Sequence, residues 1–94
     1  MYATVRSYAA GSDLADALVE NQGAVKTLLE GIDGFQAYYL VRTGDGAVSV
    51  SVYDDQIGAE ESNREAAAWI RENLSDLSVN PPQISAGEVA ISLP

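Results

Sequence analysis

Strand-forming residues alternate with polar ones along two neighbouring stretches of the chain, Phe35 to Arg42 and Ala47 to Tyr53. A period of two is typical of a strand, because successive side chains point to opposite faces of a sheet. The Gly44-Asp45-Gly46 segment between them is typical of a tight turn, since glycine adopts positive φ without steric cost. We therefore predict an antiparallel hairpin and take it as the centre of the fold.

Two more stretches with a period of two lie near the ends of the chain. Tyr2 to Tyr8 predicts a first strand, which Ala9-Ala10-Gly11 ends. Gln83 to Leu93 predicts a last strand, after an extended connector that ends in Asn80-Pro81-Pro82. Gly87 within that last strand indicates a β-bulge.

Apolar residues recur at helical spacing between these strands. The first predicted helix runs from about Asp13 to Glu30. We expect a slight break near Asn21-Gln22-Gly23, because glycine weakens a helix by about 1 kcal/mol relative to alanine. The second predicted helix begins after Asp54-Asp55, whose side chains suit an N-cap, and ends near Arg71.

The predicted order is strand, helix, strand, strand, helix, strand. With right-handed crossovers, this order gives a four-stranded antiparallel sheet with both helices on one face. The expected fold class is therefore α+β, a ferredoxin-like βαββαβ two-layer sandwich. A chain of 94 residues is expected to form a single domain, residues 1–94.

The two faces of the predicted sheet differ in polarity. One face, with Phe35, Ala37, Tyr39 and Val41 opposite the valines of the next strand, is apolar enough to meet the helices. The other mixes tyrosine, arginine and hydroxyl side chains, and we predict that it is left open. It comprises Tyr2, Thr4, Arg6, Tyr8, Tyr38, Leu40, Arg42, Ser49, Ser51, Tyr53, Ile84, Ala86, Glu88 and Ala90. Such a mixed surface indicates a partner or an enclosed site, and packing against a second copy would cover it.

Composition removes several classes of chemistry. The chain has no cysteine and no histidine, which excludes disulfides, thiolate nucleophiles and histidine general bases. Fourteen acidic residues against five basic ones give a net charge of −9, which opposes binding to nucleic acid or to an anionic membrane. No leader or membrane-span pattern is present, so we expect a soluble cytoplasmic protein. We expect no cofactor and no metal.

Arg6 and Arg42 are two of only five basic residues, and both fall on the predicted open face. They could form a site for an anion or carboxylate ligand. The alternative, which we favour, is a structural ion pair with Glu88 in the same chain or across a dimer, because a covered charge needs a partner.

Three tyrosines share that face with the arginines. Tyr8, Tyr38 and Tyr53 could line an aromatic pocket, or they could be interface residues, since tyrosine is enriched in interfaces. We favour the interface. Trp69 is expected to pack from the second helix onto the sheet or the connector. The acidic pairs Asp54-Asp55 and Glu60-Glu61 are better explained by helix capping than by a cation site.

The element order and chain length resemble the dimeric α+β barrel superfamily, which includes the antibiotic-biosynthesis-type monooxygenases. Gly34-Phe35 at the start of the second strand and the Val50-to-Asp54 segment before the second helix carry the resemblance. It implies a homodimer with two sheets face to face, and a ligand pocket between sheet and helices. Enzymatic members often use Asn, Trp and His or Arg, whereas this chain has no His and its only Trp, Trp69, lies late in the second helix. No catalytic residue is carried over.

These observations predict a small homodimeric protein that acts as a small-molecule binding or accessory module. The alternative is a cofactor-independent monooxygenase that acts on a small aromatic or polyketide-like substrate, with Arg6, Tyr38, Arg42 and Tyr53 as pocket groups.

Overall fold

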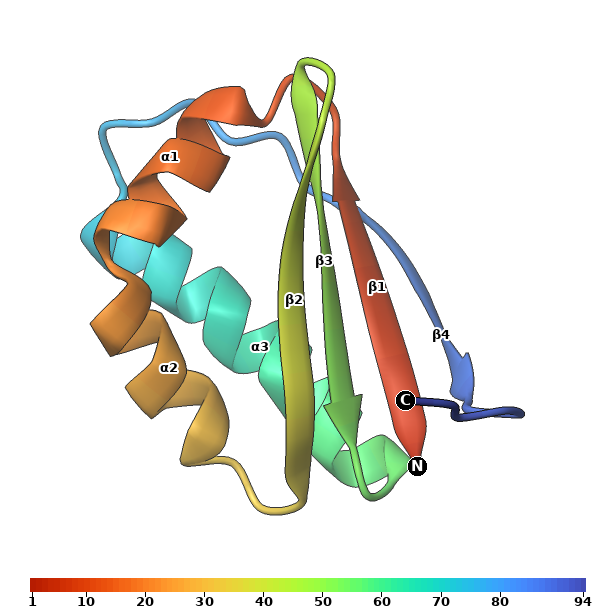
Figure 1. Ribbon diagram of the computed structural model, residues 1–94. Coiled ribbons are helices and arrows are strands. Elements are labelled where there is room, and N and C mark those ends of the chain that lie inside the picture. The colour runs from red at the N-terminus through yellow and green to blue at the C-terminus, as the bar shows by residue number, and fades with distance from the viewer.

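A four-stranded antiparallel sheet carries all of its helices on one face (Figure 1). The computed structural model describes residues 1–94. The elements are β1 (Tyr2–Tyr8), α1 (Ser12–Glu20), α2 (Gln22–Glu30), β2 (Phe35–Thr43), β3 (Gly46–Tyr53), α3 (Gln56–Asn73) and β4 (Gln83–Glu88). The strand order β2-β3-β1-β4 is that of the ferredoxin-like fold, so the predicted fold class is confirmed.

Element boundaries agree with the sequence pattern except at the last strand. The first helix is divided at Asn21 into α1 and α2, as Gly23 led us to expect. The last strand was predicted to reach Leu93 but ends at Glu88. Its pairing with β1 is regular through Gly87, so the predicted bulge there is wrong.

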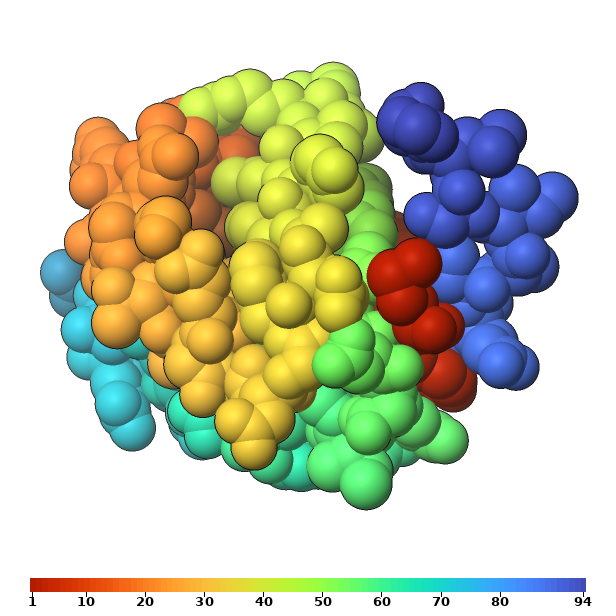
Figure 2. Space-filling view, turned by 60° about the horizontal axis from the view of Figure 1, so that its bottom comes forward, coloured from red at the N-terminus to blue at the C-terminus, as the bar shows by residue number.

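Beyond β4 the chain stands away from the sheet. Val89 donates one backbone hydrogen bond to the Met1 carbonyl, and the side chains of Ile91 and Leu93 are exposed. Figure 2 shows this segment in blue, projecting beside the N-terminal residues in red. A strand needs a neighbour to pair with, and only Val89 finds one here.

Helix α3 begins at a cap that the sequence predicted. The Asp55 side chain accepts a hydrogen bond from the Gly58 backbone N–H at 3.1 Å. Gly58 lies so close to the sheet that a Cβ there would meet the Asp33 carbonyl and the Tyr53 ring at 2.9 Å. The first turn of α3 therefore rests directly on the end of β3.

The helices cover the opposite sheet face from the one we predicted. Thr4, Arg6, Ser49, Ser51 and Tyr53, all expected on an open face, are between 0% and 3% exposed and lie beneath the helices. The expectation was wrong because it let polarity alone choose the covered face. Arginine, serine and threonine can be buried at low cost when they satisfy one another's hydrogen bonds.

The more apolar face is the one left uncovered, and we call it the apolar sheet face. Val5, Val50 and Tyr39 lie side by side across β1, β3 and β2 on this face, and Tyr39 is 62% exposed. Its members are Ala3, Val5, Ala37, Tyr39, Val41, Val48, Val50 and Val52.

A register shift in β2 changes the face of one aromatic residue. The pairing of β2 with β3 shifts between Phe35 and Ala37, so Phe35 lies opposite Tyr53 while Ala37 lies opposite Val52. Phe35 was predicted to share a face with Ala37. It faces the helices instead, with its ring 5.7 Å from that of Tyr53 in an edge-to-face arrangement.

The apolar core lies toward the hairpin end of the helix layer. Tyr8, Leu14 and Leu18 form its buried centre. Partly buried residues from α2, β2, α3 and the connector after α3 pack against this centre. They are Val25, Leu40, Trp69, Ile70, Leu74 and Val79. The expectation that Trp69 packs inward is confirmed. None of the helices has the length and apolar character that crossing a membrane would require.

Candidate functional site

Arg6 occupies the middle of the sheet, under α3, and is only 3% exposed. Its Nε donates to Ser49 Oγ at 2.9 Å and its Nη2 donates to Ser51 Oγ at 2.7 Å. Its Nη1 donates to the Ser62 carbonyl at 3.2 Å and to Asn63 Oδ1 at 3.0 Å. Strand β1 thus places the guanidinium between two serines of β3 and one turn of α3.

No carboxylate neutralises Arg6. The ion pairs of the chain are Lys26–Glu30, Arg42–Asp16 and Arg64–Glu61, all at exposed side chains. The predicted pair with Glu88 does not form, because Glu88 is the last residue of β4 and lies opposite Tyr2, at the start of β1. A buried cation that has only neutral partners keeps part of its desolvation cost.

Asn63 and Thr4 complete the polar contact between α3 and the sheet. Thr4 Oγ1 donates to Asn63 Oδ1 at 3.2 Å, and Asn63 Nδ2 donates to Thr4 Oγ1 at 3.1 Å. No fully buried side-chain nitrogen or oxygen lacks a partner. We call the set Thr4, Arg6, Ser49, Ser51, Ser62 and Asn63 the polar layer. It holds α3 on β1 and β3 by directional bonds.

A small cavity, the inner chamber, lies beside Arg6. Its volume is about 20 Å³, and its lining residues include Arg6, Tyr8, Tyr38 and Ser49. The remaining wall is apolar and comes from the three helices: Leu18, Val25, Leu28, Leu29, Ala66, Trp69 and Ile70. A chamber of this size holds about one water molecule.

Burial raises the pKa of both tyrosines in the inner chamber. For Tyr8 and for Tyr38 the loss of solvent is the larger effect, and the Arg6 charge opposes it by favouring the phenolate. The nearby Ser49 hydroxyl also lowers the pKa of Tyr38, and the Tyr8 charge raises it. Both phenols are therefore neutral donors at neutral pH.

A larger cavity, the outer groove, adjoins the inner chamber between α1, α2 and β2. Its volume is about 410 Å³, within the usual range for small-molecule sites. Seven of its ten lining residues are hydrophobic, and Leu18, Val25, Leu29 and Tyr38 line both spaces. Lys26 and Glu30 stand at its rim, joined by an ion pair of 2.9 Å. The two spaces therefore share part of one wall.

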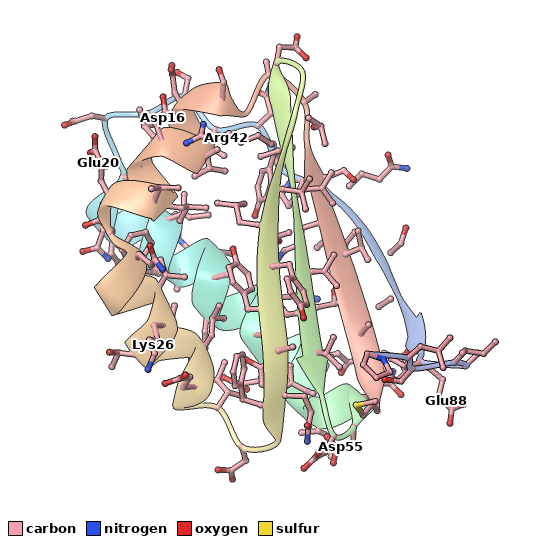
Figure 3. All side chains as sticks on the ribbon, in the orientation of Figure 1. Asp16, Glu20, Lys26, Arg42, Asp55 and Glu88 are labelled. Carbon is pink, nitrogen blue, oxygen red and sulfur yellow. The ribbon has the colours of Figure 1, made fainter.

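The structure brings three of the six sequence-predicted site residues together and places the other three elsewhere. Arg6, Tyr8 and Tyr38 meet at the inner chamber. Arg42 lies apart at the hairpin end, where it pairs with Asp16 of α1 at 2.6 Å, and Glu88 lies at the opposite end of the molecule (Figure 3). The two arginines thus do not form one anion site.

Tyr53, the remaining predicted residue, is 0% exposed, and its hydroxyl donates to the Leu29 carbonyl at 2.8 Å. It ties β3 to α2. Tyr8, Tyr38 and Tyr53 all face the helices, so the predicted role of these tyrosines in an interface of the open face is wrong.

Sequence reasoning did not find Ser62 and Asn63 as partners of Arg6. Both lie on the predicted second helix, but their contacts depend on which sheet face that helix covers. One signal was present, since Ser62 and Asn63 interrupt an otherwise charged and alanine-rich helix. The acidic residues near the start of α3 form no group of three placed to hold a metal ion.

Similarity to known proteins is found in the structure and not in the sequence. No known protein-family profile matches the sequence, and no curated protein is similar enough in sequence to count as a relative. Solved structures do match over almost the whole chain. A protein of unknown function from Nitrosomonas europaea, NE2512, is 22% identical with a TM-score of 0.71, covering 99% of this chain and 93% of its own.

The chain has a ferredoxin-like fold, and its structural neighbours are dimeric α+β barrel proteins. One neighbour is the ActVA-Orf6 monooxygenase of Streptomyces coelicolor in complex with nanaomycin D, at 18% identity, a TM-score of 0.67, and coverage of 99% and 91%. Another is a dimeric ferredoxin-like protein from an uncultured marine organism, at 12% identity, a TM-score of 0.69, and coverage of 98% and 95%. The resemblance expected from the sequence is confirmed at the level of fold.

Proposed function

We propose that this protein is a homodimer that binds a small, largely apolar molecule in the outer groove and inner chamber. The outer groove carries the proposal, because its wall is mostly apolar with a few polar groups, and it shares four lining residues with the inner chamber beside Arg6. The ligand-bound structure of a monooxygenase with the same fold supports it.

The apolar sheet face supports the homodimer. Its centre, formed by Val5, Tyr39 and Val50, has no helix over it. A second copy presents the same surface, so a two-fold axis would let each copy cover the other. The fold neighbour described as dimeric agrees with this assembly.

Binding can be followed through Trp69, which is the only tryptophan and lines the inner chamber. Small aromatic compounds should change its fluorescence emission in a saturable way. Val25→Phe, at a residue shared by the two spaces, should abolish the change, whereas Ile57→Phe on the exposed first turn of α3 should leave it intact. A Val25→Phe variant that still folds and binds equally well would place the ligand elsewhere.

A second candidate function is a cofactor-independent monooxygenase acting on a small aromatic or polyketide-like substrate. The fold shared with a monooxygenase and the phenols of Tyr8 and Tyr38 beside a buried cation favour it. Oxygen consumption with a panel of quinols and anthrones is the test. Turnover that Val25→Phe abolishes would support catalysis at this site, while binding without turnover would leave a binding module.

A further inference from the structure

Helix α2 is held less firmly than the other two helices. It buries one side chain, Leu29, whereas α1, which has the same length of nine residues, buries three. The remaining residues of α2 are exposed, apart from Val25 and Leu28, which are half-buried. An element with few buried apolar contacts can open on its own, without unfolding of the whole domain.

One side-chain hydrogen bond joins α2 to the sheet. The Tyr53 hydroxyl, from β3, donates to the Leu29 carbonyl at 2.8 Å. The side chains of Lys26 and Thr27 bond within α2 itself. By contrast, an ion pair ties α1 to β2, and the polar layer ties α3 to the sheet. Leu29 and Tyr53 thus form a single latch near the end of α2.

Both ends of α2 have residues suited to act as hinges. Asn21 separates α1 from α2 and offers α2 no side-chain cap, and a Cβ at Gly23 would find no atom within 4 Å. At the other end, residues 31–33 connect α2 to Gly34, whose carbonyl accepts a backbone hydrogen bond from Asp54 at 2.8 Å. Hinges are a few residues at the ends of elements that absorb a change in φ and ψ.

The outer groove and the inner chamber both depend on α2 for part of their walls. Val25 and Leu29 line both spaces, and Leu28 lines the inner chamber. The chamber, at about 20 Å³, has room for about one water molecule, against about 410 Å³ in the outer groove. Any larger group can enter the chamber only if one of its walls moves, and α2 is the wall that is held least.

We propose that α2 is a lid, hinged at Asn21 and at residues 31–33 and latched by Leu29 against Tyr53. Lifting the lid moves Val25 out of the shared wall and joins the two spaces. Closing it encloses a ligand beneath the helix. The inference rests on the proposed function, because a lid controls access only where a ligand enters. The structure shows the lid closed.

Cysteine labelling measures the opening directly, because the chain has no native cysteine. Ala66→Cys places a thiol on α3 in the wall of the inner chamber, which the lifted lid would uncover. Ala59→Cys is the matched control on the same helix, since Ala59 is 1% exposed and lines neither space. A small thiol reagent should modify Ala66→Cys faster than Ala59→Cys.

Urea separates opening of the lid from global unfolding. Low urea should leave the Ala66→Cys rate nearly unchanged and raise the Ala59→Cys rate steeply, because opening of the lid exposes little surface and global unfolding exposes the whole core. Leu28→Cys, on the opposite wall of the chamber, repeats the measurement if Ala66→Cys does not fold.

The latch is tested by Tyr53→Phe. This change should raise the labelling rate of Ala66→Cys by roughly fivefold, the factor that corresponds to one hydrogen bond of average strength. The rate should stay insensitive to low urea, which distinguishes a released lid from a less stable domain. Tyr2→Phe, at a half-buried tyrosine that lines neither space, should leave the rate unchanged.

A ligand should hold the lid closed. Toluene is the probe, and its dissociation constant is measured through Trp69 fluorescence. At ten times that constant, toluene should slow the labelling of Ala66→Cys about tenfold, because it stabilises the closed state.

Equal labelling of the two thiols, with the same response to urea, would show that α2 opens only with the whole domain and would overturn the lid. Labelling of Ala66→Cys at the rate of a free thiol would overturn it as well, because the chamber would then be open without any movement. No response to Tyr53→Phe would reject the latch. Urea-insensitive labelling without toluene binding would support the lid and count against the proposed function.

Discussion

Arg6 Nη2 donates to Ser51 Oγ across 2.7 Å, and both side chains are more than nine-tenths buried. This bond joins β1 to β3 in the centre of the sheet. Ser51 is the direct pairing partner of Thr4, which in turn bonds to Asn63 of α3. The two layers of the fold therefore meet through hydrogen bonds around one cation, and the apolar core lies to one side.

Removal of Asn63 should weaken the fold. Asn63→Ala deprives buried Arg6 and Thr4 of a partner, so the free energy of unfolding should fall by about 1–3 kcal/mol. Asn73→Ala is the matched control, because that asparagine is exposed on the last turn of the same helix and should cost no more than about 0.5 kcal/mol. Urea denaturation measures both. Equal effects at the two positions would mean that the polar layer does not stabilise the fold.

A charge on the apolar sheet face should separate the proposed dimer. Tyr39 is 62% exposed in a single copy, so Tyr39→Lys is compatible with a folded monomer but would bury a charge between two sheets. We expect a monomer in sedimentation velocity at concentrations where the native chain is a dimer. Ile57→Lys, at a residue that is 75% exposed on α3, should stay dimeric. A native chain that sediments as a monomer would contradict the assembly itself.

Alkaline pH should destabilise the fold partly through Tyr53. Burial raises its pKa from 10.0 to about 12, with Arg6 opposing. The folded state thus prefers the neutral phenol, and this contribution is present below pH 10 and lost as pH rises toward 12. Tyr53→Phe should lower stability at neutral pH by about 1 kcal/mol, because the bond to Leu29 is lost.

The same variant should show a shallower decline in stability between pH 10 and pH 12. Tyr2→Phe, at a half-buried tyrosine at the start of β1, is the control and should follow the native profile. Denaturant midpoints across this pH range provide the measurement. An unchanged slope in Tyr53→Phe would assign the alkaline loss to other groups.

Two glycine-to-alanine substitutions in helices should change the stability of the protein in opposite directions. At Gly58 a Cβ meets the Asp33 carbonyl and the Tyr53 ring at 2.9 Å, so Gly58→Ala should cost about 1–3 kcal/mol through overpacking. At Gly23, in α2, no atom lies within 4 Å, so Gly23→Ala should stabilise the protein by about 0.5–1 kcal/mol. Thermal unfolding of the two variants and the native chain measures both changes in stability. A stable Gly58→Ala would show that α3 can lift from the end of β3.

Local patterns were enough to predict most of the architecture. Glycine at the hairpin turn, Asp55 at the N-cap and Gly23 in a weakened helix act on their own neighbourhood, so the sequence indicates them directly. The fold class followed from their order. The end of β4 was missed because alternation continues to Leu93, while pairing requires a neighbouring strand that one copy does not offer beyond Val89.

The covered sheet face could not be obtained by the same reasoning. Choosing it from polarity gives the wrong answer, because Arg6 and its serine neighbours satisfy one another and so tolerate burial. The register shift near Phe35 compounds the error, since it turns that ring to the other side. Arg6, Tyr8 and Tyr38, singled out by residue type, line one cavity, whereas Ser62 and Asn63 become visible only when α3 is placed on the sheet.

The hydrogen bonds beneath α3 have specific partners, whereas purely apolar packing would let the helix slide along the strands. Displacing α3 by one turn would carry Ser62 and Asn63 past Arg6 and leave buried acceptors and donors unmatched. The helix therefore has a single permitted axial setting. Trp69, two turns further along it, is held at a fixed height above the tyrosines.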